Sequence, residues 1–338
     1  MNSSQQQHPS QQALPWPHIP FKRIGVIGLG RVGSVLALAL ASRGSALHAV
    51  SARRGEIAEA WCARLPARMA LSQPVPQPAS QPAPQPASLP ASLPSVQSLS
   101  AAQLVTECDL VLLALPDDAL QACCDRLPWR AGQSVLHLAG AADLTCLQSA
   151  AARGARIGSF HPLLMFGAGE AAELAALTAL PGAAVAIDAG ADTDLEQALR
   201  ALASCLRLLP IAVPAAARAA YHASAHYAAA FLCVLLQQAQ DIWRDSGLPW
   251  QQAMRALLPL AHSTLQAVAG SDGVPAQAMA GSMARGDVAT VQRHLQALPA
   301  HAQDGYRLLA LCSVEMALQA GRITAQQAEA LRGCLRIA

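Results

Sequence analysis

The chain has 338 residues, of which 53% are hydrophobic and 13% charged, and this length is sufficient for two domains that each bury a core. The formal net charge of +2 comes without a basic run, which argues against nucleic-acid binding, and the longest apolar run, Ala228–Leu236, is too short to span a membrane. The nine cysteines include no C-x-x-C pair, so we expect neither a zinc site nor a disulfide framework and predict a reduced, cytoplasmic protein.

The first segment, residues 1–20, is rich in Gln, Ser and Pro and lacks the basic and apolar parts of a signal peptide, so we expect a disordered leader. An apolar strand at residues 24–27 then runs into a Gly-x-Gly-x-x-Gly turn and a helix. Such a turn binds a dinucleotide, because its three glycines permit a tight turn, close approach of the backbone to a pyrophosphate, and close packing of the helix on the strand. The expected cofactor contacts are Gly28, Leu29, Gly30, Arg31, Val32 and Gly33.

The end of a second apolar strand, residues 46–51, indicates which dinucleotide is bound. A site that prefers NAD places a carboxylate there for the ribose 2′-hydroxyl, whereas this chain has Ser51, Arg53 and Arg54. Arginine forms strong charge-assisted hydrogen bonds with phosphate, so we predict NADP(H) with these three residues near the 2′-phosphate. The alternative is that the two arginines only solvate the start of the next helix.

Alternating strands and helices are predicted to complete a Rossmann-like α/β domain over residues 21–213, with a mostly parallel sheet. Residues 72–98, which repeat Gln-Pro, Ala-Ser and Leu-Pro units, are expected to form a low-complexity insertion that joins neither sheet nor helix. Strands are expected at residues 109–113, 134–137, 155–159, 183–187 and 206–211, and helices at residues 55–70, 143–153 and 192–205. The turn Leu115-Pro116-Asp117, at a strand end, is predicted to lie beside the nicotinamide, with Asp117 and Asp118 as helix N-caps.

From residue 214 to residue 338 the sequence predicts an all-helical domain for substrate binding or dimerisation. A long helix over residues 215–246 is expected to be followed by helices at residues 250–269, 275–284, 287–297, 303–320 and 324–335. Thr324 and Gln327 have the spacing of a capping box at the start of the last helix. The apolar face at residues 231–236 is compatible with a homodimer through this domain and equally with an internal core.

Six stretches of the chain together resemble a known family. They are Gly28-Leu29-Gly30-Arg31-Val32-Gly33, Leu115-Pro116-Asp117-Asp118, His137-Leu138-Ala139-Gly140-Ala141, Ser159-Phe160-His161-Pro162-Leu163, Tyr221-His222-Ala223 and Ala284-Arg285-Gly286-Asp287. They resemble the two-domain Rossmann-like oxidoreductases related to the 6-phosphogluconate dehydrogenase superfamily, which have a C-terminal helical domain of unknown function. The resemblance implies an NADP-binding reductase of a small carbonyl or imine compound, similar to the alternative class of ketopantoate reductase, with Ala139 and Gly140 also at the cofactor. The chain departs from many relatives at Ala139, where they carry Ser, and at Ala230, where they carry Asn.

Proton donors for such a reaction are limited, because the only lysine is Lys22, ahead of the first strand. Hydride transfer to a carbonyl leaves an alkoxide that must be protonated, and histidine serves this role well near neutral pH. We therefore predict His161, at the end of a strand, and His222, on the long helix, as the catalytic residues. Arg218, Tyr221 and His226 are the predicted substrate-binding residues, since Arg218, His222 and His226 share a helical face.

Each of these predictions has a structural alternative. His161 can bond the backbone of a crossover loop, and the helical stripe can simply face solvent. His137 lies within a buried strand pattern and is expected to be a core or cofactor-contacting histidine. His222 and His226 have no third ligand at helical spacing, so no metal is expected.

The leading interpretation is a cytoplasmic NADPH-dependent reductase that acts on a small carbonyl or imine substrate, such as a 2-oxo acid, in the cleft between two domains. One rival is a dehydrogenase of the prephenate or arogenate type, whose His-Pro pair is similar to His161-Pro162, but an arginine cluster for a dicarboxylate is not evident. The other rival is a non-catalytic NADP-binding sensor or assembly protein, which the losses at Ala139 and Ala230 favour and the histidines oppose.

Overall fold

The computed structural model describes residues 19–44, 46–71 and 95–336 and divides the chain into two compact units, Met1–Ala225 and His226–Ala338. The unit boundary falls inside a helix, α8 (Arg218–Ala228), whereas the sequence places the domain boundary after residue 213. The leader predicted for residues 1–20 lies almost wholly outside the described residues, as do residues 72–94 of the predicted insertion. Each unit is described by itself.

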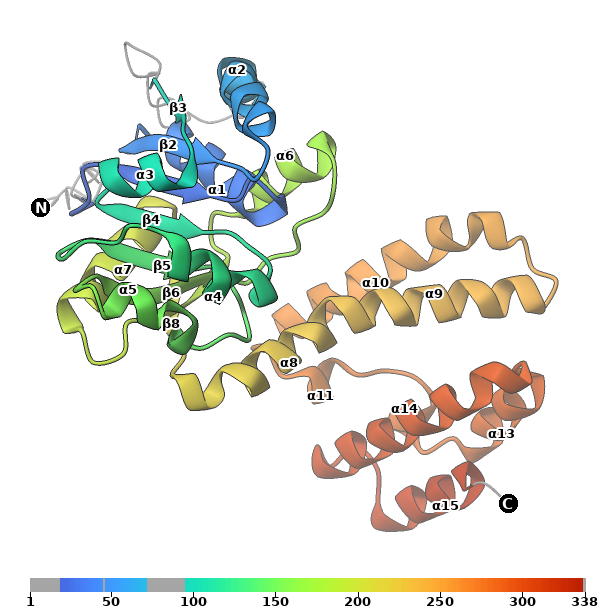
Figure 1. Ribbon diagram of the computed structural model, residues 1–338. Helices are drawn as coiled ribbons and strands as arrows, with labels where there is room; N and C mark the ends of the chain where they lie inside the picture. Colours follow the sequence, from blue (N-terminus) through green and yellow to red (C-terminus); the bar gives the residue numbers. More distant parts are fainter. Residues whose placement is uncertain (1–18, 45, 72–94, 337–338) are drawn as a thin grey trace, which may run out of the picture. The chain divides into compact units, whose positions relative to one another are not determined.

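The first unit is built on one eight-stranded sheet with the order β3-β2-β1-β4-β5-β6-β7-β8 (Figure 1). The strands are β1 (Ile24–Ile27), β2 (Leu47–Ser51), β3 (Gln97–Ser98), β4 (Leu110–Leu113), β5 (Ser134–His137), β6 (Arg156–Pro162), β7 (Ala184–Asp188) and β8 (Leu209–Ala212). All neighbouring strands are parallel except β6 and β7, which are antiparallel. The first six strands have the order of a dinucleotide-binding Rossmann sheet, so the predicted fold class is confirmed.

Helices cover both faces of this sheet because its central strands are apolar on both sides. In β4, Leu110 and Leu112 point into the core beneath α1 (Arg31–Ser42), α2 (Gly55–Leu71) and α7 (Thr193–Cys205). Val111 and Leu113 point to the opposite face, toward α3 (Ala101–Glu107) and α4 (Asp117–Arg126). The remaining helices of this unit are η1 (Leu144–Leu147), α5 (Gln148–Ala151), α6 (Glu170–Ala179) and η2 (Ala215–Ala217).

Several predicted elements of this unit are wrong in detail. The predicted helix at residues 143–153 is a 3-10 turn followed by the single turn α5. The predicted insertion, residues 72–98, includes residues that join the sheet, since Gln97 and Ser98 pair with β2 and Val96 packs against the core. Helices α3 and α6 had not been predicted. The predicted helix at residues 215–246 is interrupted at Ala229, whose φ of −124° and ψ of −78° are not helical.

The described part of the second unit contains helices and loops and no strand, which agrees with the all-helical prediction. Its helices after α8 are α9 (Ala230–Asp245), η3 (Trp250–Gln252), α10 (Ala253–Gly270), α11 (Pro275–Ala278), α12 (Ser282–Arg285), α13 (Val288–Ala297), α14 (Ala300–Gln319) and α15 (Ala325–Leu335). The single helix predicted at residues 275–284 is two short helices, because Gly281 has φ +103°.

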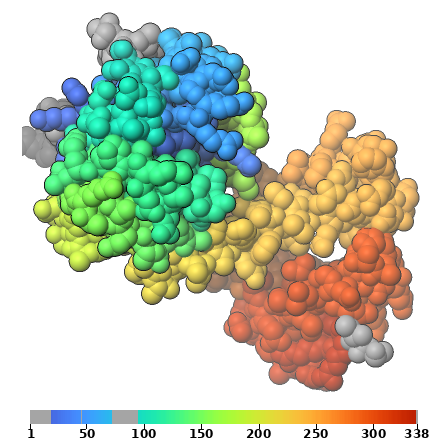
Figure 2. Space-filling view, in the orientation of Figure 1, coloured from blue at the N-terminus to red at the C-terminus, as the bar shows by residue number. Residues whose placement is uncertain are grey.

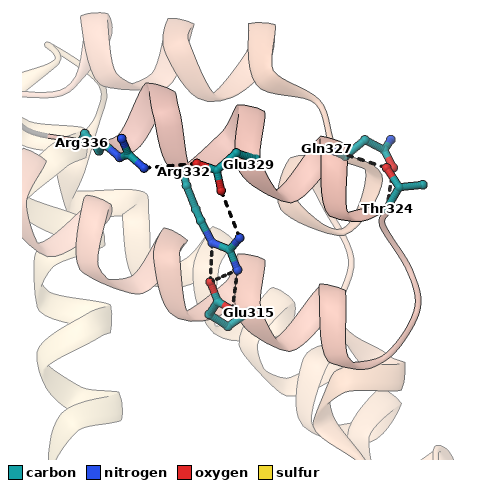
Figure 3. Close-up of polar contacts among 6 residues, drawn as sticks. All are labelled: Glu315, Thr324, Gln327, Glu329, Arg332 and Arg336. Atoms are coloured by element: carbon teal, nitrogen blue, oxygen red, sulfur yellow. Dashed lines mark hydrogen bonds and ion pairs between the residues drawn. The ribbon is translucent and has the colours of Figure 1, made fainter.

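Helices α14 and α15 are joined by polar contacts around a small core (Figure 3). Arg332 donates hydrogen bonds to both carboxylate oxygens of Glu315 at 2.7 and 2.8 Å, and Glu329 pairs with Arg336 at 3.1 Å. The predicted capping box is confirmed, because Gln327 N–H donates to the Thr324 hydroxyl and its side chain accepts from Thr324 N–H. The ion pairs are largely exposed, so the core and the cap contribute most of the stability here.

Helices α9 and α10 carry many exposed apolar side chains. Phe231, Val234 and Leu235 of α9 are 41 to 52% exposed, and the space-filling view shows side chains of this hairpin at the surface of the second unit (Figure 2). Taken together, the successive helices over Ala215–Asp245 are long and apolar enough to cross a membrane by length and composition alone, with a mean hydropathy of 1.3 in an 18-residue window. A single helix of this kind is weak evidence for a membrane span.

Candidate functional site

The glycine-rich turn after β1 leaves room for a ligand at one glycine and needs the other two for the fold. Gly28 has φ +100°, and a side chain there would overlap the Ala114 carbonyl oxygen. A side chain at Gly33 would overlap the Gly28 carbonyl oxygen, which explains how α1 packs so closely on the turn. A side chain at Gly30 would meet no described protein atom within 4 Å. The open side of the turn therefore lies at Gly30.

The start of α1 suits a pyrophosphate. Gly30 is the N-cap residue and has no side chain to bond the first amides, and the first turn contains no acidic residue. The free N–H groups and the helix dipole at this position attract an anion. Leu29 and Val32 pack partly against the core, whereas Arg31 is exposed beside the turn. These residues fit a dinucleotide phosphate in the manner predicted.

The three residues predicted to lie near the 2′-phosphate, at the end of β2, have different surroundings. Ser51 is buried, and its carbonyl accepts a 2.8 Å hydrogen bond from Gly28 N–H, so strand and turn are tied together. Arg54 lies 3.7 Å from Glu56, and both side chains are about 70% exposed. Arg53 is exposed as well. Because Glu56 offsets part of the charge of Arg54, Arg53 is the better candidate for a phosphate contact.

The end of β4 lies next to this turn, since Ala114 N–H donates to the Ile27 carbonyl at 2.8 Å. The N-cap residue of α4 is Pro116, so the prediction that Asp117 and Asp118 cap this helix is wrong; both lie in its first turn. Leu115 and Pro116 therefore connect β4 to α4 at the carboxyl edge of the sheet, where the nicotinamide half of a dinucleotide is expected.

A histidine and a tyrosine meet at the same edge of the sheet. His161 lies inside β6 and does not follow it as predicted, because β6 extends to Pro162 through its antiparallel pairing with β7. Its Nδ1 is 2.9 Å from the hydroxyl of Tyr221 on α8, with the two rings perpendicular. The ring of His222 is 5.9 Å from that of His161, at an angle of 75°.

Gly140 forms the floor on which these rings converge. A side chain at Gly140 would overlap His222 Nδ1 and come within 2.9 Å of His161 Nε2. Three separate segments therefore meet here, namely the turn after β5, strand β6 and helix α8. The structure thus brings together the two predicted catalytic histidines, predicted substrate residue Tyr221 and predicted cofactor residue Gly140.

Burial determines the charge of the histidines in this cluster. Burial, helped by His222 and Arg218, lowers the pKa of His161 from 6.5 to about 4. Burial also raises the pKa of the Tyr221 hydroxyl, while the nearby Arg218 acts in the opposite direction. At neutral pH, His161 is therefore a neutral imidazole bonded to a neutral tyrosine hydroxyl.

Arg218 was predicted to bind substrate, but its side chain lies in the protein interior. Its side chain is only 1% exposed, and its two terminal nitrogens donate to the Ser159 hydroxyl at 2.7 Å and to the Ala139 carbonyl at 2.9 Å. Asp188 lies 4.0 Å away. Sequence reasoning did not identify Ser159 or Asp188, although a serine inside an otherwise apolar strand is a signal of a buried polar partner. These contacts favour a positioning role for Arg218.

Two other predicted histidines lie around this cluster. His137 is completely buried at the end of β5, its Nδ1 accepts from Ala139 N–H at 3.2 Å, and burial lowers its pKa to about 3. His226 lies one turn beyond His222 on α8, with its ring 6.1 Å from that of Phe231. In the described ranges, no group of three or more His, Cys, Asp or Glu side chains could hold a metal ion.

Comparison with known proteins agrees with this geometry. Residues 23–139 match the family described as NADP oxidoreductase coenzyme F420-dependent, and residues 183–312 match the domain of unknown function DUF2520. With the glycine turn and the Rossmann sheet, these matches define the class: the chain is an NADP-dependent oxidoreductase. Within that class, the two matches give the chain an NADP-binding domain followed by a DUF2520 region, which begins at the last two strands of the sheet and continues into the helical unit.

Solved structures share the fold over most of the chain. A protein named as an NADP oxidoreductase from Bacteroides fragilis is 19% identical, with a TM-score of 0.62, over 88% of this chain and 100% of that one. A pyrroline carboxylate reductase from Plasmodium falciparum, solved with NADP bound, is 13% identical over 93% and 99% of the two chains, with a TM-score of 0.53. An imine reductase from Pseudomonas is 18% identical over 93% and 92%, with a TM-score of 0.50. No curated protein matches the sequence significantly.

Proposed function

We propose that this oxidoreductase uses NADPH to reduce a small carbonyl or imine compound, such as a 2-oxo acid or a cyclic imine, with His161 and Tyr221 as the proton-donating pair. The observation that carries the proposal is the 2.9 Å contact between His161 Nδ1 and the Tyr221 hydroxyl above the bare backbone of Gly140. The pair lies at the carboxyl edge of the sheet, where the fold class binds its ligands.

The bound cofactor supplies the hydride in such a reaction, and the protein supplies the proton. Reduction of a carbonyl leaves a negative charge on oxygen, which a donor within hydrogen-bond reach must neutralise. With Tyr221 O–H donating to Nδ1, the proton of His161 lies on Nε2, which faces Gly140. Nε2–H can then protonate the substrate oxygen while Nδ1 takes the proton of Tyr221.

The charge of Arg218 assists this relay. Burial raises the pKa of the Tyr221 hydroxyl and so opposes loss of its proton, whereas the neighbouring Arg218 charge offsets part of this rise by stabilising the negative oxygen that forms. Solvent then returns a proton to Tyr221. A permanently charged imidazolium is not required, which is consistent with the pKa of about 4 for His161.

The reductase neighbours and the donor pair support the proposed class of substrate. The pyrroline carboxylate and imine reductases that share this fold are named for reduction of C=N compounds, which supports cyclic imines as test substrates. Because the contacts of Arg218 leave it without a free donor pair for a substrate carboxylate, 2-oxo esters and simple imines belong in the same screen. The predicted homodimer, the cytoplasmic location and the interdomain position of the substrate stay predictions.

The proposal is tested by NADPH oxidation over a panel of 2-oxo acids, 2-oxo esters, and cyclic and simple imines, followed by the variants His161→Ala and Tyr221→Phe. We expect His161→Ala to lower kcat by roughly 10²–10⁴-fold with unchanged NADPH affinity, and Tyr221→Phe to lower it by a smaller factor. Full activity of both variants would show that the pair is not the donor. Binding of NADPH without turnover of any panel member would favour the non-catalytic alternative.

A further inference from the structure

Arg218 is the largest fully buried side chain of the described residues. Arginine is almost never buried to this degree unless its charge and its donors are paired. Here three strands provide the partners of its terminal nitrogens, namely the Ala139 carbonyl after β5, the Ser159 hydroxyl in β6 and the Asp188 carboxylate at the end of β7, whereas the buried Nε has no hydrogen-bond partner.

The same arginine begins α8, and this location connects it to the donor pair. Tyr221 and His222 follow three and four residues later, so all three side chains lie on one face of the helix. Fixing the first residue of α8 to the sheet therefore fixes the direction in which the next turn of the helix points. That turn carries the Tyr221 hydroxyl to His161 Nδ1.

We propose that Arg218 is a positioning residue, which holds the start of α8 on the ends of β5, β6 and β7 and so places Tyr221 and His222 around His161. Gly140 provides the space for this arrangement, because any side chain there would meet both histidines. The inference rests on the proposed function only for its kinetic test. The placement itself can be tested without a substrate.

The charged and titratable groups around His161 come from several elements. Tyr221, His222 and Arg218 face it from α8, and His137 faces it from β5. Asp188 of β7 lies beside Arg218. Burial is the main cause of the low pKa of His161, and His222 and Arg218 add to it. Because burial and His222 remain when the arginine charge is removed, we expect the pKa of His161 to rise only modestly from about 4.

Titration of the histidine ring nitrogens by nuclear magnetic resonance measures this shift in the full-length protein. In Arg218→Met we expect a higher pKa of His161 and loss of the Tyr221 hydrogen-bond signature on Nδ1. In Arg218→Lys, which keeps the charge but cannot bond two acceptors in a fork, we expect the pKa to stay low while the Tyr221 signature weakens. Arg156→Met is the matched control. Arg156 is also an arginine that contacts β6 and pairs with a carboxylate, that of Asp192, but it lies at the first residue of the strand, roughly 16 Å from His161.

A second variant keeps the inference testable if Arg218→Met does not fold. Ser159→Ala removes one acceptor of the arginine and leaves its charge in place, so we expect a weaker Tyr221 signature with little change in the pKa of His161. Once a substrate is known, Arg218→Lys is expected to lower kcat about tenfold or more, with the NADPH dissociation constant unchanged.

The positioning role would be overturned if Arg218→Met left both the His161 titration and the Tyr221 signature unchanged. It would also be overturned if the Arg156→Met control showed shifts of the same size. An active His161→Ala variant would instead overturn the proposed donor and leave the titration result standing. The two failures are therefore distinguishable.

Discussion

Alanine at Gly30 separates what the fold requires from what the ligand requires. A methyl group at this position meets no described protein atom within 4 Å, and the residue has φ −75°, which alanine adopts without strain. Replacement of glycine under these conditions stabilises a protein by about 0.4–1 kcal/mol, because the unfolded chain loses freedom. We therefore expect Gly30→Ala to fold with an equal or slightly higher Tm.

The affinity for NADPH is expected to fall in the same variant. The methyl group occupies the open side of the turn, where the backbone must approach a pyrophosphate. Loss of one hydrogen bond to a charged group costs about 1.5–3 kcal/mol, which corresponds to a dissociation constant roughly 10- to 150-fold higher. Gly33→Ala should behave differently, because its methyl group overlaps the Gly28 carbonyl oxygen. We expect this overlap to destabilise the fold by about 1–3 kcal/mol or more.

Calorimetric titration with NADPH and thermal unfolding by circular dichroism distinguish these effects. Gly333→Ala on α15 is the matched control, since a methyl group there also meets no described atom. Its NADPH affinity should stay close to that of the starting protein, and its Tm should be equal or slightly higher, because alanine favours a helix over glycine by about 0.5–1 kcal/mol. If Gly30→Ala binds NADPH as tightly as the control does, the turn does not hold the pyrophosphate and the reasoning fails.

Three further predictions use the same protein. Arg53→Asp should reduce the preference for NADPH over NADH by roughly 1.5–3 kcal/mol in calorimetry, and Arg54→Asp by less because Glu56 already lies 3.7 Å from it; equal effects would contradict this assignment. Replacing residues 73–94 with a short Gly-Ser link should leave the Tm nearly unchanged, whereas extending the deletion through residues 95–98 should lower it, because strand β3 is then lost. Gly140→Ala should displace the histidine rings and lower kcat by about 10²-fold with NADPH affinity preserved, and an unaltered kcat would argue against convergence at this glycine.

The sequence predicted the Rossmann half well because its signals are local. The strand at residues 134–137 and the helix after Asp192 appear where periodicity and capping place them. The end of β6 was missed because its extension depends on antiparallel pairing with β7, a partner that lies more than twenty residues further along the chain. Strand β3 was missed because its two residues follow a proline-rich stretch and gain their structure from β2.

The candidate site was predictable in its parts and not in their contacts. Residue type and location pointed to His161, Tyr221 and His222, yet the pairing of His161 with Tyr221 depends on how α8 lies on the sheet. Helical spacing alone suggested that Arg218 faces a substrate. The structure places its guanidinium against Ser159 and Ala139 instead, a choice that only the three-dimensional packing of strand ends determines.

The antiparallel pairing of β6 with β7 has a consequence for changing what this enzyme accepts. Ser159 is level with the last residue of β5, so the three residues that follow extend β6 beyond the edge of the parallel strands as a two-stranded ribbon with β7. In that ribbon Phe160 is completely buried, whereas the next residue, His161, is partly exposed. One side of the proposed reaction site is therefore a hydrogen-bonded ladder whose side chains alternate between the core and that site. A one-residue insertion in this ladder would shift its register and turn the side chain of His161 into the core, whereas a loop can accept an insertion. A change of substrate selectivity on this side must therefore come from substitutions at alternate positions.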